Sequence, residues 1–253
     1  MKKVTAFLII SFLFVLSVLL TTSTWAQTPL TGEEILRRVD ANIGSDNKIA
    51  TAEMIIHGRR GSRAIKSKSW VSGEEKSYTE YLAPAREAGT KMLKLEDQLW
   101  TYIPSTDRTI KIAGHMLRQS VMGSDLSYED MMEDPELLNL YEANIIGEEI
   151  YLDRPCWILE LTAKVEDISY HSRKIWVDKE RYVSLKEERF ARSGKLLKIF
   201  EVKEVRQFQN RWVPTRMVFK DALKNGEGTE YKIETIEFNA DIPEALFTKA
   251  SLR

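Results

Sequence analysis

Short runs in which apolar and polar residues alternate follow one another from Lys48 to Asn239. The run "RAIKSKSWV" is one example, and turn signals such as "PSTD", "DKER" and "RSGK" separate such runs. Period-two alternation is the pattern of a β-strand with one buried face. Because helix patterns hardly interrupt these runs, antiparallel connections are the economical solution. We therefore expect a single, mainly β domain with about ten or eleven strands.

Helical patterns occur in three places after the N-terminal leader. In "TPLTGEEILRRVDANIG", Thr31 and Glu34 have capping-box spacing, apolar residues recur on one helical face, and Gly44 is a stop signal. A second helix is expected in the middle of the chain, and "DIPEALFT" predicts a short helical turn near its end. The first of these helices is amphipathic, so its apolar face must pack against another element.

The first 26 residues have the three-part pattern of a secretory signal peptide. Lys2 and Lys3 precede an apolar run over 4–20, and the small residues Thr24 and Ala26 suit a cleavage site after Ala26. We predict a leader over 1–26 and a periplasmic domain over 27–253. The alternative is an uncleaved membrane anchor, because the apolar run is near the shorter end of a spanning helix.

The single cysteine, Cys156, excludes an internal disulfide and suits a bacterial periplasmic protein. It lies in the apolar run "RPCWILEL", which indicates a buried structural thiol rather than a nucleophile. The net charge of the whole chain is −1, and no acidic or basic block occurs. Nucleic acid is therefore not an expected partner.

Catalytic and metal-binding motifs are missing from the sequence. There is no G-x-S-x-G, H-E-x-x-H, C-x-x-C or phosphate-loop pattern. The three histidines, His57, His115 and His171, are scattered without a second ligand at metal-binding spacing. Serines beside His171 could suggest a hydrolase, but a polar strand edge is the favoured interpretation. We expect no enzyme activity, no metal and no cofactor.

The mid-chain stretch "MGSDLSYEDMMEDPELL", from Met122 to Leu138, interrupts the strand pattern. Ser127 with Asp130 is an N-cap arrangement, and acids in a first helical turn are favoured by the helix dipole. We interpret the acids of this stretch as helix-start and solvent-facing charges. The spacing of the acids does not fit a calcium-binding loop.

The apolar residues of the same stretch include Tyr128, Met131 and Met132, which have helical i, i+3 and i+4 spacing. Methionine side chains adapt to irregular shapes and suit surfaces that bind varied apolar partners. Two interpretations remain open. In one, the helix packs as ordinary core against the sheet; in the other, it covers an apolar cavity until a ligand displaces it. The two are compatible, because a helix that packs on the sheet can also cover a cavity.

Four segments in this order and spacing resemble the LolA-like outer-membrane lipoprotein-sorting family in its broader form. They are "GEEILRRVD" followed by "TAEMII", "LWTYIPSTDRTIKI", "MGSDLSYEDM" and "FNADIPEALFTKASL". The resemblance implies a single curved, incompletely closed antiparallel β-barrel, with helices that cover its concave apolar face. It also implies an apolar cavity that takes acyl chains, and no catalysis.

The resemblance further implies a periplasmic carrier or chaperone that moves lipoproteins or other lipids toward the outer membrane. Expected partners are acyl chains and an inner-membrane exporter of RND or ABC type, with transient membrane contact by a monomer. The alternatives are a non-carrier accessory subunit of an RND-type exporter and, less favoured, a secreted lipid hydrolase. The absence of a lipid-bearing cysteine fits a soluble shuttle better than a tethered acceptor.

Within this framework the mid-chain helix is expected to be the cavity cover, with Gly123 and Ser124 as its hinge. Tyr128, Met131 and Met132 would then form the apolar face of the cover. Five further aromatic residues are candidates for the cavity lining or its rim, although ordinary core packing explains each equally well. These residues are Trp70, Trp100, Tyr102, Trp176 and Trp212.

Overall fold

Within the residues that the structure describes, thirteen strands form one open antiparallel sheet. The computed structural model describes residues 30–253 apart from 45–46, 59–60, 134–135 and 167. The expected leader and its cleavage site lie outside this range. The strand order is β6-β5-β4-β3-β2-β1-β13-β12-β11-β10-β9-β8-β7, so β6 and β7 form the two free edges.

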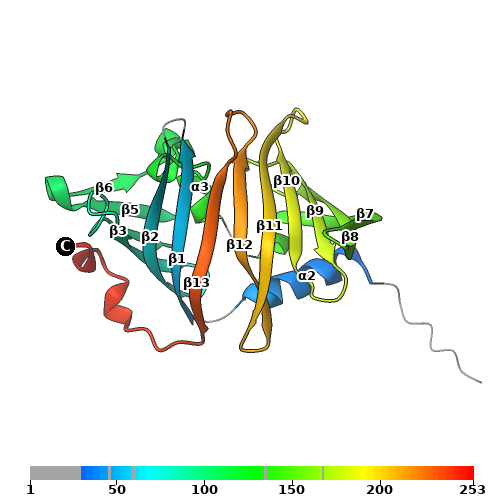
Figure 1. Ribbon diagram of the computed structural model, residues 1–253, viewed down its shortest axis with the longest axis horizontal. Coiled ribbons are helices and arrows are strands. Elements are labelled where there is room, and N and C mark those ends of the chain that lie inside the picture. The colour runs from blue at the N-terminus through cyan, green and yellow to red at the C-terminus, as the bar shows by residue number, and fades with distance from the viewer. Residues whose placement is uncertain (1–29, 45–46, 59–60, 134–135, 167) are drawn as a thin grey trace, which may run out of the picture. The chain divides into compact units, whose positions relative to one another are not determined.

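Consecutive strands pair with each other, except β6 and β7, which lie at opposite edges. The pairing of β13 with β1 joins the two halves of the sheet. Figure 1 shows β1, β13, β12 and β11 side by side in the middle of the sheet. The strands are β1 (Asn47–Gly58), β2 (Gly61–Ser72), β3 (Lys76–Ala83), β4 (Lys91–Leu95), β5 (Gln98–Ile103), β6 (Arg108–Ile112), β7 (Tyr141–Tyr151), β8 (Arg154–Ala163), β9 (Ser172–Asp178), β10 (Ser184–Phe190), β11 (Leu196–Phe208), β12 (Arg211–Asp221) and β13 (Thr229–Phe238).

The prediction of a mainly β, incompletely closed antiparallel fold is confirmed, although the described residues contain more strands than the ten or eleven expected. One hairpin has a turn that the sequence does not signal. The turn between β7 and β8 consists of Leu152 and Asp153, whose φ angles are 50° and 57°. Such angles suit Asn-Gly or Asp-Gly, and Leu-Asp gives no comparable turn signal in the sequence.

The helix α2 (Gly32–Ile43) forms as its capping pattern predicts. The Thr31 side chain accepts a hydrogen bond from the Glu34 N–H at 3.1 Å, and the helix ends at Gly44. Ile35 and Leu36 are completely buried, and the helix packs against β7, β12 and α4 (Leu137–Leu140). Its amphipathic face thus covers part of the sheet, as expected for this pattern.

The sheet has two faces with different covers. The face that packs against α2 and the mid-chain segment is called the inner face, and the opposite one the outer face. The mid-chain segment contains α3 (Tyr128–Met132) and two 3₁₀-helices, η2 (Gly114–Arg118) and η3 (Val121–Gly123). A further 3₁₀-helix, η1 (Pro104–Thr106), connects β5 to β6.

The C-terminal segment covers the outer face of the first strands. It contains η4 (Glu244–Leu246), where a short helical turn was expected, and η5 (Lys249–Leu252). Phe247 and Leu252 pack there against Tyr78, Leu93 and Trp100, and Figure 1 shows this segment in red beside the first strands. None of the helices in the described part of the chain is both long and apolar enough to cross a membrane.

Candidate functional site

Two cavities lie on the inner face of the sheet. The first has a volume of about 320 Å³, is open to the surface and is lined by α2, α4, the mid-chain segment and strands β9 to β12. Its apolar wall includes Leu36, Val39, Ile175 and Phe200. Asp130, Glu133, Arg173, Glu187 and Arg189 also line it, so one side of this apolar cavity is charged.

The second cavity has a volume of about 310 Å³ and lies toward strands β1, β2 and β3. It is lined by Met54, Ile65, Tyr81, Val121, Leu126, Met131, Met217, Phe219, Tyr231 and Ile233, together with Ser67, Ser69 and Thr79. Phe219 lines both cavities. The two cavities are therefore neighbours that share part of a wall.

The mid-chain segment contributes to both cavities. Ser127 and Asp130 form the capping box of α3, with the Ser127 Oγ accepting from the Asp130 N–H at 3.1 Å. Tyr128 and Met132 pack against the inner-face core around Met54 and Ile65. Met131 is 39% exposed and lines the second cavity. Of the three residues expected on the apolar face of the cover, two pack on the sheet and one faces a cavity.

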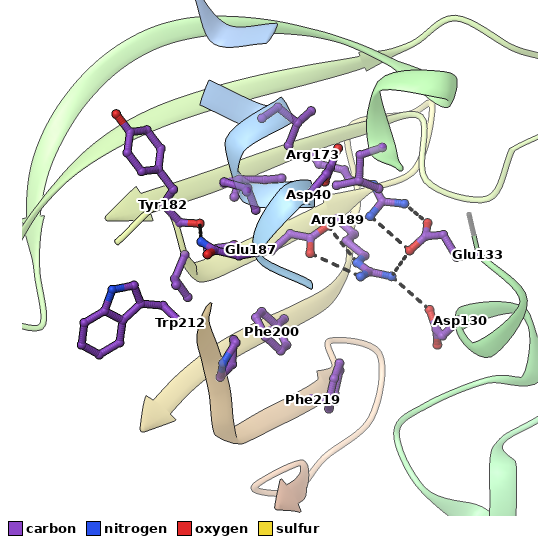
Figure 2. Close-up of a pocket in the computed structure, with 18 residues that line it drawn as sticks. Asp40, Asp130, Glu133, Arg173, Tyr182, Glu187, Arg189, Phe200, Trp212 and Phe219 are labelled. Atoms are coloured by element: carbon purple, nitrogen blue, oxygen red, sulfur yellow. Dashed lines mark hydrogen bonds and ion pairs between the residues drawn. The ribbon is translucent and has the colours of Figure 1, made fainter. Parts of the chain in front are cut away.

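A cluster of charged side chains joins this segment to the sheet at the first cavity (Figure 2). Arg173 on β9 donates from Nη1 to Glu187 on β10 at 2.8 Å and to Glu133 at 3.2 Å. Arg189 on β10 contacts Glu187 at 3.0 Å, Asp130 at 3.3 Å and Glu133 at 3.2 Å. We call these five residues the ionic cluster.

Burial and charge act against each other in the ionic cluster. Burial alone would raise the pKa of Glu187 and of Asp130. The charge of Arg189, together with Arg173 at Glu187 and with hydrogen bonds at Asp130, outweighs burial and lowers both pKa values. Burial and the charge of Arg189 lower the pKa of Arg173 to about 10, so its guanidinium remains charged at neutral pH. The cavity wall therefore holds paired ions and not neutralised side chains.

The interpretation of the mid-chain acids as solvent-facing charges is wrong for Asp130, whose side chain is only 5% exposed. The Tyr170 hydroxyl donates to Asp130 at 2.5 Å, in addition to the contact from Arg189. Asp125 likewise accepts from the Thr229 hydroxyl at 2.7 Å and from the Asp221 N–H at 3.1 Å. Both acids face the sheet because an arginine and hydrogen-bond donors on its strands need negatively charged oxygens as partners.

Three of the expected lining residues lie on the outer face. Trp70, Trp100 and Tyr102 pack in the cluster that the C-terminal segment covers. The Lys249 ammonium of η5 lies 4.3 Å from the Trp100 ring centroid. None of the three lines either of the two cavities.

The two remaining tryptophans differ in position. Trp176 alternates along β9 with Arg173 and Ile175, which line the first cavity, so it points to the opposite side of the strand. Its indole donates to Glu149 at 2.9 Å, and Lys186 lies 4.2 Å from its ring centroid. Trp212 lines the first cavity (Figure 2).

Sequence reasoning missed Arg173, Glu187 and Arg189. A signal was present, because Arg173 has the same strand parity as Ile175, and Glu187 and Arg189 share a parity in β10. A charged residue at the buried parity of a strand indicates a buried ion pair or a site. In the described residues no group of three His, Cys, Asp or Glu side chains could hold a metal ion. Cys156 is buried, and burial raises its pKa to about 11.

Solved structures share this fold over most of the chain. A DUF1329 family protein from Desulfovibrio piger superposes with a TM-score of 0.79 at 24% identity, covering 88% of this chain and 98% of that one. A domain from Vibrio parahaemolyticus, described as an outer membrane lipoprotein-sorting protein, superposes with a TM-score of 0.74 at 26% identity, covering 87% of this chain and 97% of that one. A LolA superfamily protein from Nitrosomonas europaea has a TM-score of 0.73 at 23% identity, covering 88% of this chain and 99% of that one.

An open antiparallel sheet with helically covered apolar cavities on one face defines a class of protein, the lipoprotein-sorting-like carrier fold. A family model with the description "Uncharacterized protein" matches residues 73–253. No curated protein matches the chain. The chain belongs to the family of that model, and its fold is LolA-like.

Proposed function

We propose that this protein is a periplasmic carrier that binds acyl chains of lipoproteins or other lipids and moves them toward the outer membrane. The observation that carries the proposal is the pair of apolar cavities, of about 320 and 310 Å³, beneath the helices of the inner face. Each volume lies at the lower end of the range for small-molecule sites. The likeness to the outer membrane lipoprotein-sorting domain from Vibrio parahaemolyticus supports the same function.

Such a carrier is needed because exposure of an acyl chain to water is unfavourable. Transfer of each CH₂ group out of water lowers the free energy by about 0.8 kcal/mol, so an acyl chain without a carrier stays in the membrane. A carrier must offset this cost and still release its cargo. Adjacent cavities with one shared wall suit chains of different lengths, because displacement of the intervening side chains would join the two spaces.

The segment from Gly123 to Met132 is the movable part of this proposed device. It contributes Met131 to the second cavity and Asp130 to the ionic cluster of the first. Gly123 has a φ of 73° and Met122 a φ of 51°, so a tight turn precedes the helix. Opening must break polar contacts to the strands as well as apolar packing.

The cellular setting belongs to the same proposal. The expected leader directs the domain to the periplasm, where an inner-membrane exporter of RND or ABC type would load it. Transient contact with the outer membrane would unload it. We propose that binding and release, without catalysis, are its whole chemistry.

Native mass spectrometry of the mature protein, purified from its host without detergent, tests this function. The expected result is a folded monomer with copurified lipid that is lost on denaturation. Protein that carries no lipid and takes up none from vesicles would contradict the carrier function and favour an accessory subunit. Conversion of the bound lipid to a cleaved product would favour a hydrolase.

A further inference from the structure

The wall of the first cavity has more positive charge on the sheet than the sheet itself neutralises. Arg173 and Arg189 share a single strand carboxylate, Glu187. Lys198 on β11 lies beside this wall, 3.8 Å from Asp130, and adds a third cation that pairs with Asp221 at 3.4 Å. The balance comes from elements that lie over the sheet, because Asp130 and Glu133 belong to the mid-chain segment and Asp40 to α2.

Glu133 is the carboxylate that both arginines share with the mid-chain segment. Its oxygens accept hydrogen bonds from both terminal nitrogens of Arg173, and Arg189 Nη1 lies 3.2 Å from its Oε2. Its side chain is 19% exposed, whereas that of Arg173 has no exposed surface. Outward movement of the segment would therefore leave two buried guanidinium groups without this partner.

Arg173 also has a hydrogen-bonding capacity that the protein does not use. Its Nε is buried and has no acceptor, the single such side-chain nitrogen or oxygen among the described residues. Tyr141 and Tyr170 flank the guanidinium, with ring centroids 4.5 and 5.5 Å from its Cζ, and hold it in place. A buried N–H without an acceptor is costly, so a ligand oxygen at this position would be favoured.

We propose that the first cavity binds amphiphiles whose acyl chain ends in a carboxylate or phosphate head, with Arg173 and Arg189 binding that head in place of Glu133. The inference rests on the proposed carrier function and names its cargo class. Guanidinium groups bind carboxylate and phosphate oxygens through paired, charge-assisted hydrogen bonds. Leu36, Val39 and Phe200 would contact the chain in the same cavity.

Titration calorimetry on the mature protein with three probes of equal chain length tests the head group. Dodecanoate and dodecyl phosphate should bind about ten-fold or more tightly than dodecanol, the value expected for one charge-assisted hydrogen bond. Acetate and inorganic phosphate should not compete with them. Binding of inorganic phosphate as tight as that of dodecyl phosphate would identify a free-anion site and overturn the proposal.

The variant Glu133→Gln makes the test specific, because it removes the competing carboxylate and predicts a gain of affinity. Dodecanoate should bind about five- to ten-fold more tightly, with dodecanol unchanged. Glu129→Gln removes the same charge from α3, four residues before Glu133 and outside the ionic cluster, and should change the affinity for neither dodecanoate nor dodecanol. Arg189→Gln should reduce dodecanoate binding to the level of dodecanol.

These measurements distinguish a failure of the head-group assignment from a failure of the proposed carrier function. Equal binding of dodecanoate and dodecanol overturns the head-group assignment and leaves the carrier function standing. A uniform gain for all probes in Glu133→Gln also overturns it, since that result would reflect only a loosened cover. Absence of binding for every probe, in folded protein, overturns both the assignment and the carrier function.

Discussion

Arg173 shows that the inner face is not built for stability alone. Its side chain has no exposed surface, yet it shares Glu187 with a second arginine. Desolvation of buried ion pairs often costs as much as their attraction returns, so apolar residues would stabilise the same place equally well. The charge is therefore better explained by a ligand or by a cover that must open than by the fold itself.

The adjacent methionines of α3 provide a matched pair of variants. Met131 lines the second cavity and is 39% exposed, whereas Met132 packs against the inner-face core. We expect Met131→Ser to weaken binding of a fluorescent fatty-acyl probe with little change in melting temperature. Met132→Ser should lower the melting temperature more, because Met132 is partly buried against the core; the loss should be smaller than the cost of about 2–5 kcal/mol for a fully buried methionine. Probe titration and thermal unfolding of both variants measure these effects. If Met131→Ser lowered the melting temperature more and Met132→Ser weakened probe binding more, the assignment of Met131 to the cavity and Met132 to the core would be contradicted.

Acidification should weaken the ionic cluster. Asp130 and Glu187 have folded-state pKa values below their usual 3.8 and 4.5, mainly through Arg189. Each therefore binds fewer protons in the folded than in the unfolded state, and its stabilisation is present at neutral pH. That stabilisation is lost as pH falls below about 5 and through the folded pKa.

Urea unfolding at pH 7 and at pH 3, below the ordinary pKa of both carboxyl groups, measures this effect. The free energy of unfolding should fall between the two, and Asp130→Asn should be less stable at pH 7 but lose less on acidification. If Asp130→Asn lost as much free energy of unfolding on acidification as the wild-type protein, Asp130 would not be a source of the pH dependence.

At the scale of elements, the segment over the inner face is held more firmly than its short helix suggests. Besides the ionic cluster, Lys198 donates to the Asp125 carbonyl at 2.5 Å, and Lys224 donates to the Ser124 carbonyl at 3.2 Å. These contacts tie the segment to β11 and to the turn after β12. Opening must then be driven by a bound ligand or partner that replaces them.

A disulfide between this segment and β13 tests whether movement is required. The Asp125 N–H donates to the Thr229 Oγ at 3.0 Å, so the two residues are direct neighbours and are the pair chosen for cysteine substitution. In a Cys156→Ala background, oxidised Asp125→Cys/Thr229→Cys should neither load nor release probe, and reduction should restore both rates. Normal exchange by the oxidised protein would show that the segment is not a lid.

The elements themselves could be predicted from local patterns, since capping residues and period two act within a few residues. The helix at Gly32–Ile43 and the capping box of Ser127 with Asp130 are examples. Which face a tryptophan occupies depends instead on sheet register and on the distant C-terminal segment. The ionic cluster likewise joins residues about 40 and 59 positions apart, and no local pattern encodes such pairing.

At the scale of the whole molecule, the two faces of the sheet differ in what they carry. The two apolar cavities and the ionic cluster lie on the inner face, whereas on the outer face Trp70, Trp100 and Tyr102 form a packed layer beneath the C-terminal segment. A change on the outer face should therefore affect stability and leave cargo binding intact, provided that the sheet transmits little between its faces.

Leu252 is the sharpest test of this division, because it is completely buried against the outer-face cluster and lies far along the chain from the mid-chain cover. Leu252→Ala should lower the free energy of unfolding by about 2–5 kcal/mol through loss of buried apolar contact. The dissociation constant of a fatty-acyl probe, measured well below the lowered melting temperature, should stay within about two-fold of the wild-type value, since a surplus of folded protein remains. Trp212→Ala, at the first cavity, should instead weaken probe binding. If Leu252→Ala weakened probe binding as strongly as Trp212→Ala, the outer aromatic layer would belong to the cargo site, as the sequence first suggested for Trp70, Trp100 and Tyr102.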